Sequence, residues 1–529
     1  MSALDADSQQ APQRTGGTSV LVKNILWQWA FVFTTFAVAI LVPRYMIRTL
    51  GPDRYGIWVL AFSLIEYAWV FDLGFSPAVY TMTSRHYIRG EHRQIHEILN
   101  TVLFLFLGMG ILLIAIVAAL LPPLAGFFRI APELRFDFYA LMMMVAVAFA
   151  NAQSLRSYAT ALEGFNRFDL LNQVRVPLTI VRSAVMLVLL YQGFSLPVLG
   201  AVTVGSQILG NWMNMRQFRL LLPEYRFNIH QASWATLRRL SGFGMTAFVC
   251  NTAAIVSQFS AAVLIGRYRT VADTGYYNVV NRLLQQLVQL LDRTGLVAAP
   301  KAGELDNDGK KESIARLGVL FNRYTLAVFM PVTIWLVLYG RELIALWISP
   351  EVAERTADLM PVMVLATAFA LAGQAATRPM LFGMGRITRL TWAMVTEAVA
   401  TVVLGIVAVR LWGLFGVAVV FSAGMVANRG FVVAWILSRE AGAGYVRFMG
   451  SIYVLPTVCA IPVAAGAWYM KMTYLQGDGS WLEILTAAAL IGLAYYPVAF
   501  FVCTRQADRH TAVTFARGRM ARLLQRKSA

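Results

Sequence analysis

Long apolar stretches, separated by short polar segments, follow one another along almost the whole chain. There are about fourteen of them, each roughly 20 to 30 residues long, and about 20 apolar residues suffice for a helix to cross a bilayer core. The pattern predicts an all-α polytopic membrane protein, with twelve helices as the alternative if the last pair is not counted. We place the helices at about 24–46, 54–82, 95–123, 136–160, 169–192, 194–222, 233–265, 272–299, 313–340, 356–384, 388–410, 412–438, 447–471 and 481–504.

Composition supports the membrane class. Apolar residues make up 58% of the 529 positions and charged residues only 14%, whereas soluble domains carry about 25% charged residues. The formal net charge of +18 would suggest a nucleic-acid partner in a soluble protein. Because the basic residues gather in short loops, we attribute the charge to membrane topology and lipid headgroups, and expect no nucleic-acid partner.

The basic residues also predict an orientation. Alternate loops and both tails, taken as one face, hold about 28 Lys and Arg, and the opposite loops about 11. Cytoplasmic loops carry the excess of positive charge, so we expect both termini in the cytoplasm. The predicted tails are residues 1–23, which are polar and read as disordered, and residues 505–529, which are basic and could lie on the anionic inner leaflet.

Three short matches recur at nearly constant spacing. Gly56 and Gly275 lie in segments that open predicted helices and are 219 positions apart; Gly164 and Gly383 lie in segments that close helices and are also 219 apart. Gly200 lies 216 positions before its counterpart in a third match. Matches six helices apart predict a parallel repeat. The expected organisation is an N-lobe at 24–222 and a C-lobe at 233–438, both of six helices, and an appended helix pair at 447–504.

Several segments resemble a known family. Leu50-Gly51-Pro52-Asp53-Arg54-Tyr55-Gly56-Ile57-Trp58 and Phe71-Asp72-Leu73-Gly74-Phe75-Ser76 resemble the opening signature of the polysaccharide-transporter family, the Wzx-type oligosaccharide flippases. Pro300-Lys301-Ala302-Gly303-Glu304-Leu305 and Gly383-Met384-Gly385-Arg386 resemble later parts of its pattern. The likeness spans roughly residues 20 to 440.

The resemblance implies membership of the multidrug/oligosaccharidyl-lipid/polysaccharide exporter superfamily. Its members have two bundles of six helices around a central cavity, which opens alternately to either side of the membrane. It implies a bacterial inner-membrane flippase that moves undecaprenyl-pyrophosphate-linked oligosaccharide repeat units for O-antigen, capsule or exopolysaccharide biosynthesis. The implied partners are that polyprenyl-linked cargo, membrane lipids, and a polymerase and chain-length regulator of the same pathway. Two alternatives within the superfamily stay open: a lipid II-type flippase and a cation-coupled multidrug exporter.

Arginines inside the predicted helices are the main candidates for cargo contact. A buried arginine is costly in lipid and usually faces a cavity or a partner, and its planar donors suit pyrophosphate oxygens. Arg175 and Arg378 lie near the inner face and could instead reach the headgroups, while Arg293 could pair locally with Asp292. The candidates are Arg182, Arg282, Arg429, Arg175, Arg293 and Arg378.

Acidic residues within the helices are fewer. Glu397 and Glu66 lie near mid-helix, where each could take up a proton or cation during transport or pair with an interior arginine. Asp72 is a third candidate for ion coupling, although the Asp72-Leu73-Gly74 sequence favours a bend in the helix. Gln258 and similar amides suit ordinary interhelical hydrogen bonds.

The sequence gives little support to an enzyme. The predicted outer loops are all short, whereas a membrane glycosyltransferase or polymerase, the alternative from another class, needs a sizeable loop or domain for its catalytic carboxylates. The chain has no GxSxG, HExxH or paired-cysteine motif. We therefore expect no catalytic residues, no cofactor and no metal site.

Overall fold

The computed structural model describes residues 18–72, 75–165, 167–241, 245–296, 298–474 and 480–504. Across these ranges the chain is helical and contains no β-strand, which confirms the predicted all-α class. The chain divides into two compact units, Met1–Ile255 and Val256–Ala529. The division falls inside α8, Met245–Tyr268, whereas the predicted lobes meet between residues 222 and 233.

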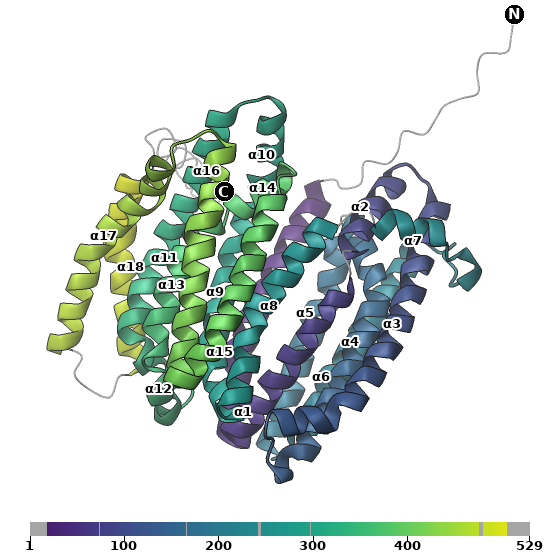
Figure 1. The fold of residues 1–529 in the computed structure, drawn as a ribbon, viewed down its shortest axis with the longest axis horizontal. Coiled ribbons are helices and arrows are strands. Elements are labelled where there is room, and N and C mark those ends of the chain that lie inside the picture. Colours follow the sequence, from purple (N-terminus) through teal and green to yellow (C-terminus); the bar gives the residue numbers. More distant parts are fainter. Residues whose placement is uncertain are drawn as a thin grey trace, which may run out of the picture. The chain divides into compact units, whose positions relative to one another are not determined.

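The first unit is built on α3, α4, α5 and α6, which run side by side in Figure 1 and pack pairwise, α3 on α4 and α4 on α6. Apolar side chains of α3 and α4, such as Phe106 and Tyr158, form the centre of its core. Its elements are α1 Thr18–Glu66, η1 Tyr67–Asp72, α2 Phe75–Ile88, α3 His92–Phe127, η2 Pro132–Leu134, α4 Arg135–Gly164, α5 Phe168–Tyr191, α6 Leu196–Leu221, η3 Ile229–Gln231 and α7 Trp234–Ser241.

The second unit is built around α11, which packs against α13, α17 and α18. Its elements are α9 Val271–Leu296, α10 Ala298–Asn307, α11 Lys311–Trp347, α12 Pro350–Thr356, α13 Leu359–Gln374, α14 Thr377–Gly383, α15 Thr388–Met425, η4 Val426–Val432, α16 Val433–Glu440, α17 Tyr445–Tyr474 and α18 Trp481–Cys503.

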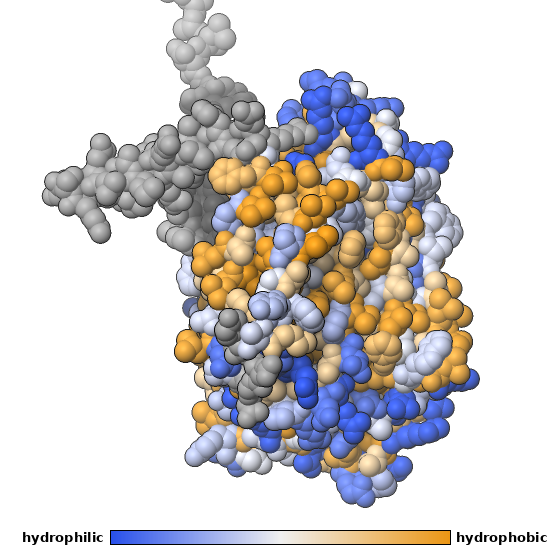
Figure 2. Space-filling view, turned by 90° about the vertical axis from the view of Figure 1, so that its left-hand side faces the viewer, coloured by the Kyte–Doolittle hydropathy of each residue, from blue (hydrophilic) through white to orange (hydrophobic). Residues whose placement is uncertain are grey.

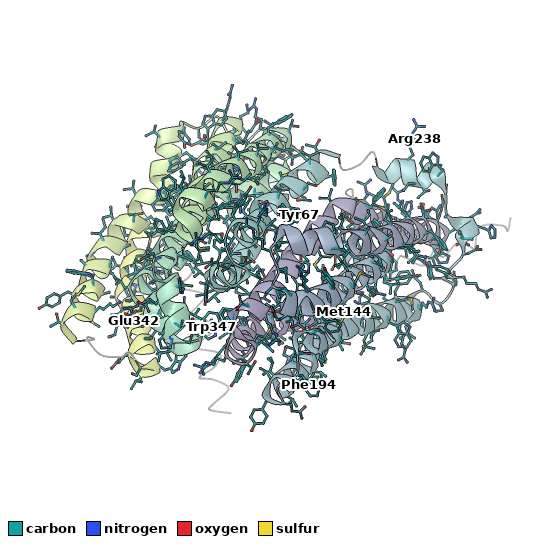
Figure 3. The ribbon with its side chains drawn as sticks, turned by 60° about the horizontal axis from the view of Figure 1, so that its bottom comes forward. Tyr67, Met144, Phe194, Arg238, Glu342 and Trp347 are labelled. Carbon is teal, nitrogen blue, oxygen red and sulfur yellow. The ribbon has the colours of Figure 1, made fainter. Side chains whose placement is uncertain are left out.

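The appended pair, α17 and α18, is docked onto α11 by polar contacts as well as apolar ones. Lys471 Nζ of α17 lies 2.8 Å from Glu342 Oε1 of α11, near the end of α11 that Figure 3 marks with Glu342 and Trp347. The indole N–H of Trp335 donates to the carbonyl oxygen of Ile484 in α18 at 3.0 Å. Figure 2 shows the face formed by this pair, where apolar residues dominate the middle and hydrophilic residues gather at the ends. Such a band matches a bilayer core.

Ten helical segments of the described chain are long and apolar enough to cross a membrane. Two of them, Phe33–Val70 and Thr388–Glu440, each cover two of the predicted helices. The ten do not include α6 or α9, whose residues are less apolar. A multi-pass membrane protein is thus confirmed, while the count of fourteen stays a prediction.

Two glycines divide the longest helices. Gly51 in α1 has φ +82° and Gly413 in α15 has φ +62°, and neither has helical backbone angles. A glycine adopts positive φ without the steric cost that a side chain would bring. The first break falls within the predicted gap at 46–54, and the second lies one residue beyond the predicted start at 412.

One predicted helix, 233–265, is described in two parts. They are α7, which ends at Ser241, and α8, which begins at Met245; the prediction of a continuous helix falls at 242–244 outside the described residues. The segment before α7 is tied to the start of α3: Ser233 N–H donates to Thr101 Oγ1 at 3.0 Å, and the Thr236 hydroxyl contacts Glu97. These bonds keep α7 at the end of the bundle, where Figure 3 shows Arg238 extending outward.

Candidate functional site

The second unit contains a polar cavity of about 290 Å³. Its walls come from α8, α9, α13, α14, α15 and η4, so side chains far apart in sequence share one space. The lining combines arginines, a carboxylate, five side-chain amides and hydroxyls with apolar groups. The polar residues of the lining are Ser257, Gln258, Tyr277, Asn281, Gln285, Gln289, Thr367, Gln374, Arg378, Glu397, Ser422 and Arg429.

A buried ion pair lies in the cavity wall. Arg429 Nη2 lies 2.8 Å from Glu397 Oε1, and Arg429 Nε lies 2.9 Å from the same oxygen. Asn428 Nδ2 donates to the other carboxylate oxygen at 2.6 Å, and Ser257 Oγ donates to Oε1 at 2.7 Å. The Glu397 side chain is 1% exposed and that of Arg429 19%. The carboxylate is therefore enclosed by donors, while the guanidinium still borders the cavity.

A π-helical turn positions two of these donors. The η4 segment closes i→i+5 hydrogen bonds over Val426–Val432, and such a turn locally shifts the register of a helix. Asn428 and Arg429, adjacent in sequence, both reach the Glu397 carboxylate from it. Tyr453 of α17 donates its hydroxyl to the carbonyl oxygens of Gly430 and Phe369, at 3.1 and 2.8 Å, which ties η4 to α13.

A short break between α13 and α14 positions Arg378. Ala376 N–H donates to the buried Asn322 Oδ1 at 2.9 Å, and Asn322 Nδ2 donates to Thr377 Oγ1 at 2.7 Å. Asn322, on α11, thus satisfies the backbone that the break would leave without a partner. The break brings Gln374 and Arg378 onto the cavity wall from two different helices.

Three of the candidate residues from the sequence are therefore brought together: Glu397, Arg429 and Arg378 line one cavity. Arg282 is exposed on α9 and does not line it. Arg293 also falls on α9, but its side chain lies outside the described residues. The roles in cargo binding and ion coupling stay predictions for all of them.

The remaining candidates belong to the first unit. Arg175 Nη2 lies 3.2 Å from Glu163 Oε1, and Arg182 is partly exposed farther along α5. Glu66 lies beside Trp69 and Arg156, and the Arg156 guanidinium lies 4.6 Å from the centre of the Trp69 ring. Arg175 and Glu66 thus have partners of their own.

Asp72 has a structural task at the start of α2. Its Oδ1 accepts from Ser76 Oγ at 2.6 Å, and its Oδ2 accepts from Ser76 N–H at 3.3 Å. A carboxylate that accepts from the first turn of a helix stabilises that helix end. Leu73 and Gly74, where the sequence favours a bend, lie outside the described residues, and ion coupling by Asp72 stays a prediction.

Sequence reasoning missed most of the neutral cavity wall. Tyr277, Asn281, Gln285 and Gln289 recur every four residues along α9, which places them on one helix face. That spacing is visible in the sequence and could have marked a polar face. The contacts of Ser257 and Asn428 with Glu397 had no such signal, because they join separate elements.

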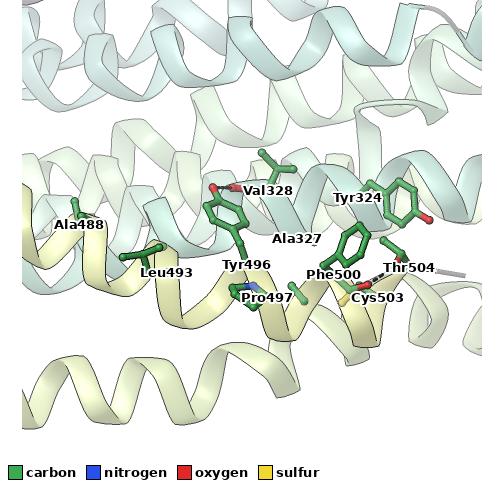
Figure 4. A pocket seen from close by; sticks show the side chains of 13 residues that line it. Tyr324, Ala327, Val328, Ala488, Leu493, Tyr496, Pro497, Phe500, Cys503 and Thr504 are labelled. Carbon is green, nitrogen blue, oxygen red and sulfur yellow. Dashed lines mark hydrogen bonds between the residues drawn. The ribbon is translucent and has the colours of Figure 1, made fainter. Parts of the chain in front are cut away.

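A second, apolar hollow of about 970 Å³ lies between α11 and α18 (Figure 4). Leu493, Pro497 and Phe500 of α18 face Ala327 and Val328 of α11 across it. Such a surface suits alkyl chains and offers a phosphate almost no partner. No cluster of three or more His, Cys, Asp or Glu that could hold a metal occurs among the described residues.

Known proteins similar to this chain include a sequence relative and several solved structures. The chain is 19% identical over 425 residues to a Shigella flexneri protein named "Putative O-antigen transporter", which covers 79% of this chain and 98% of the relative. The fold of this chain is similar to that of the lipid II flippase MurJ in an inward closed conformation. The TM-score is 0.70 at 14% identity, over 90% of this chain and 98% of the flippase chain.

A second solved structure is an inward-facing multidrug resistance MATE family transporter of the MOP superfamily. It has a TM-score of 0.63 at 14% identity, over 80% of this chain and 98% of that one. The family model described as "Polysaccharide biosynthesis protein" matches residues 45–357, which is more than half of the chain. The chain therefore belongs to the polysaccharide biosynthesis protein family.

Proposed function

We propose that this protein is a flippase that moves undecaprenyl-pyrophosphate-linked oligosaccharide units across the bacterial inner membrane for envelope polysaccharide synthesis. The observation that carries the proposal is the polar cavity of the second unit, buried among membrane helices and lined by two arginines and one carboxylate. The lining holds two arginines and one carboxylate, and guanidinium groups at a cavity wall favour an anionic group.

The family and the named relative support a transporter rather than an enzyme. In the proposed cycle the pyrophosphate and its sugars enter the protein from the cytoplasmic side while the polyprenyl chain stays in lipid. A cationic drug is a poor cargo for this cavity, because like charges repel in a medium of low dielectric constant. A lipid II-type flippase would share the charge requirement, and the family membership favours a polysaccharide precursor.

Export should depend on the candidate arginines. Arg378→Ala, Arg182→Ala and Arg282→Ala should each lower surface polysaccharide about tenfold or more, since a hydrogen bond to a charged group contributes about 1.5–3 kcal/mol. Lysine at the same positions should retain more export, because the charge survives although the paired donors are lost. The measurement is surface polysaccharide in a deletion strain carrying each variant, divided by the amount of variant in the membrane.

Arg89, exposed in the loop after α2, provides the control, and Arg89→Ala should export normally. Normal export by all three candidate alanine variants, at normal abundance, would show that a cationic path for pyrophosphate is wrong for this protein. Sugar transfer by the purified protein would instead favour a glycosyltransferase or polymerase.

Orientation in the membrane gives an independent test. Reporter domains fused after residues 90, 230, 310 and 529 should report the cytoplasm, and fusions near 128, 270 and 476 the outside, because the positive loops stay inside. The measurement uses paired reporters, one active only in the cytoplasm and the other only outside it. A C-terminus on the outside would contradict an even number of helices with both ends in the cytoplasm.

A further inference from the structure

Five side-chain amides converge on the cavity of the second unit. Gln258 comes from α8, Asn281, Gln285 and Gln289 from α9, and Gln374 from the end of α13. None of the five makes a side-chain hydrogen bond to another described residue, and Gln374 Oε1 is fully buried without a partner. We refer to these five residues as the amide wall.

The burial of the five amides differs. Gln374 Oε1 is enclosed, Asn281 and Gln285 are partly buried, and Gln258 and Gln289 are exposed. A buried polar atom without a hydrogen bond loses the free energy of its contact with water, and native structures leave few such atoms, so Gln374 Oε1 in particular calls for a partner. The cost also shows in α9, which is less apolar than the ten segments that could cross a membrane by composition. Five amides directed at one space are therefore better explained by a polar occupant of that space than by helix packing.

The chemistry of the amide wall indicates the class of ligand that the cavity binds. A carboxamide offers two N–H donors and one carbonyl acceptor, and a hydroxyl both donates and accepts. Amides can therefore donate hydrogen bonds to the hydroxyls of a sugar ring and also accept hydrogen bonds from them.

The size of the cavity sets a further limit. At about 290 Å³ it lies at the lower end of ligand pockets, which span roughly 300–1,000 Å³. It has room for one ring rather than for a whole oligosaccharide. Since the arginines and the amide wall line the same cavity, the ring next to the pyrophosphate is the one that meets the amides.

We propose that the amide wall recognises the first sugar of the lipid-linked cargo through its hydroxyl groups. The inference rests on the proposed function, because it takes the arginines as the pyrophosphate contacts. It assigns separate roles to the two groups of side chains. Arg378 and Arg429 bind the pyrophosphate that all such cargoes share. Gln285, Gln289 and the other amides bind the sugar, so that a lipid pyrophosphate with a sugar binds more tightly than one without.

The test measures the affinity of the full-length protein, purified in detergent, for three probes by calorimetry. The probes are farnesyl pyrophosphate and the same lipid carrying N-acetylglucosamine or galactose. We expect the wild type to bind at least one sugar-bearing probe more tightly than farnesyl pyrophosphate. Gln285→Leu and Gln289→Leu should each weaken that binding roughly three- to tenfold, as expected for one lost hydrogen bond, and leave farnesyl pyrophosphate within about twofold.

Gln286→Leu is the matched control, because Gln286 is on the same helix but does not line the cavity; it should bind all probes as the wild type does. Gln285→Met and Gln289→Met guard against a packing effect and should match the leucine variants. If the leucine variants bind every probe normally, or if no sugar improves wild-type binding, the amide wall does not recognise sugar.

An arginine variant shows whether a negative result concerns only the amide wall or the proposed function as well. Arg378→Gln should weaken all three probes alike, because each carries the pyrophosphate. If Arg378→Gln has this effect and the leucine variants have none, only the inference about the amide wall fails. If the wild type binds none of the probes, both the inference and the proposed function fail.

Discussion

Arg429→Ala should both destabilise the protein and abolish export. The substitution leaves the Glu397 carboxylate, only 1% exposed, with Asn428 and Ser257 as partners but without its cation. Removal of one partner from a buried ion pair costs about 3–5 kcal/mol, because the other charge stays buried and uncompensated. The expected result is a lower thermal unfolding midpoint in detergent, a lower amount of protein in the membrane, and no surface polysaccharide.

Removal of the carboxylate should lower the unfolding midpoint less than removal of the arginine does. Glu397→Gln keeps an acceptor for Asn428 or Ser257, and the Arg429 side chain, 19% exposed at the cavity, can be hydrated there. Glu397→Gln/Arg429→Gln should recover most of the unfolding midpoint lost in Arg429→Ala but not the export, since the cation is still missing. Equal midpoints for Arg429→Ala and the wild type would show that the pair contributes nothing measurable to stability.

The sequence predicts the fold class well because membrane helices obey one strong rule. In lipid every backbone polar group must be bonded within the segment, so a long apolar run leaves few alternatives to a helix. Breaks at Gly51 and Gly413 were also predictable to within a residue or two, since glycine tolerates positive φ. The attachment of α7 to α3 was not, because it depends on contacts of Ser233 and Thr236 with side chains far away in the sequence.

The candidate site was predicted only in part, for a similar reason. An ionisable residue in the middle of an apolar run is conspicuous, so Glu397 and Arg429 could be named from the sequence. Their pairing depends on the π-helical turn at η4 and on the approach of α8, neither of which leaves a periodic signal. The amides of α9 do leave one, but their spacing is also that of ordinary interhelical contacts.

Gly373→Ala should lower export as strongly as Arg429→Ala does, although it changes no charge. A Cβ on Gly373 of α13 would overlap the carbonyl oxygens of Arg429 and Gly430 in η4. Both contacts are backbone atoms, so α13 and η4 must move apart, and such overpacking typically costs about 1–3 kcal/mol. Because η4 carries Arg429, the movement should disturb its contact with Glu397. The measurements are surface polysaccharide per amount of protein and the unfolding midpoint.

Gly466→Ala is the matched control in the same unit, since a Cβ there has no heavy atom within 4 Å and alanine favours a helix over glycine by about 1 kcal/mol. It should leave export normal and the midpoint unchanged or slightly raised. A double-mutant cycle identifies the cause, because residues that act through one contact are not additive. Gly373→Ala should cost less stability in the Glu397→Gln/Arg429→Gln background than in the wild type. Full additivity would mean that Gly373 supports packing alone and does not hold η4 in the position from which Arg429 reaches Glu397.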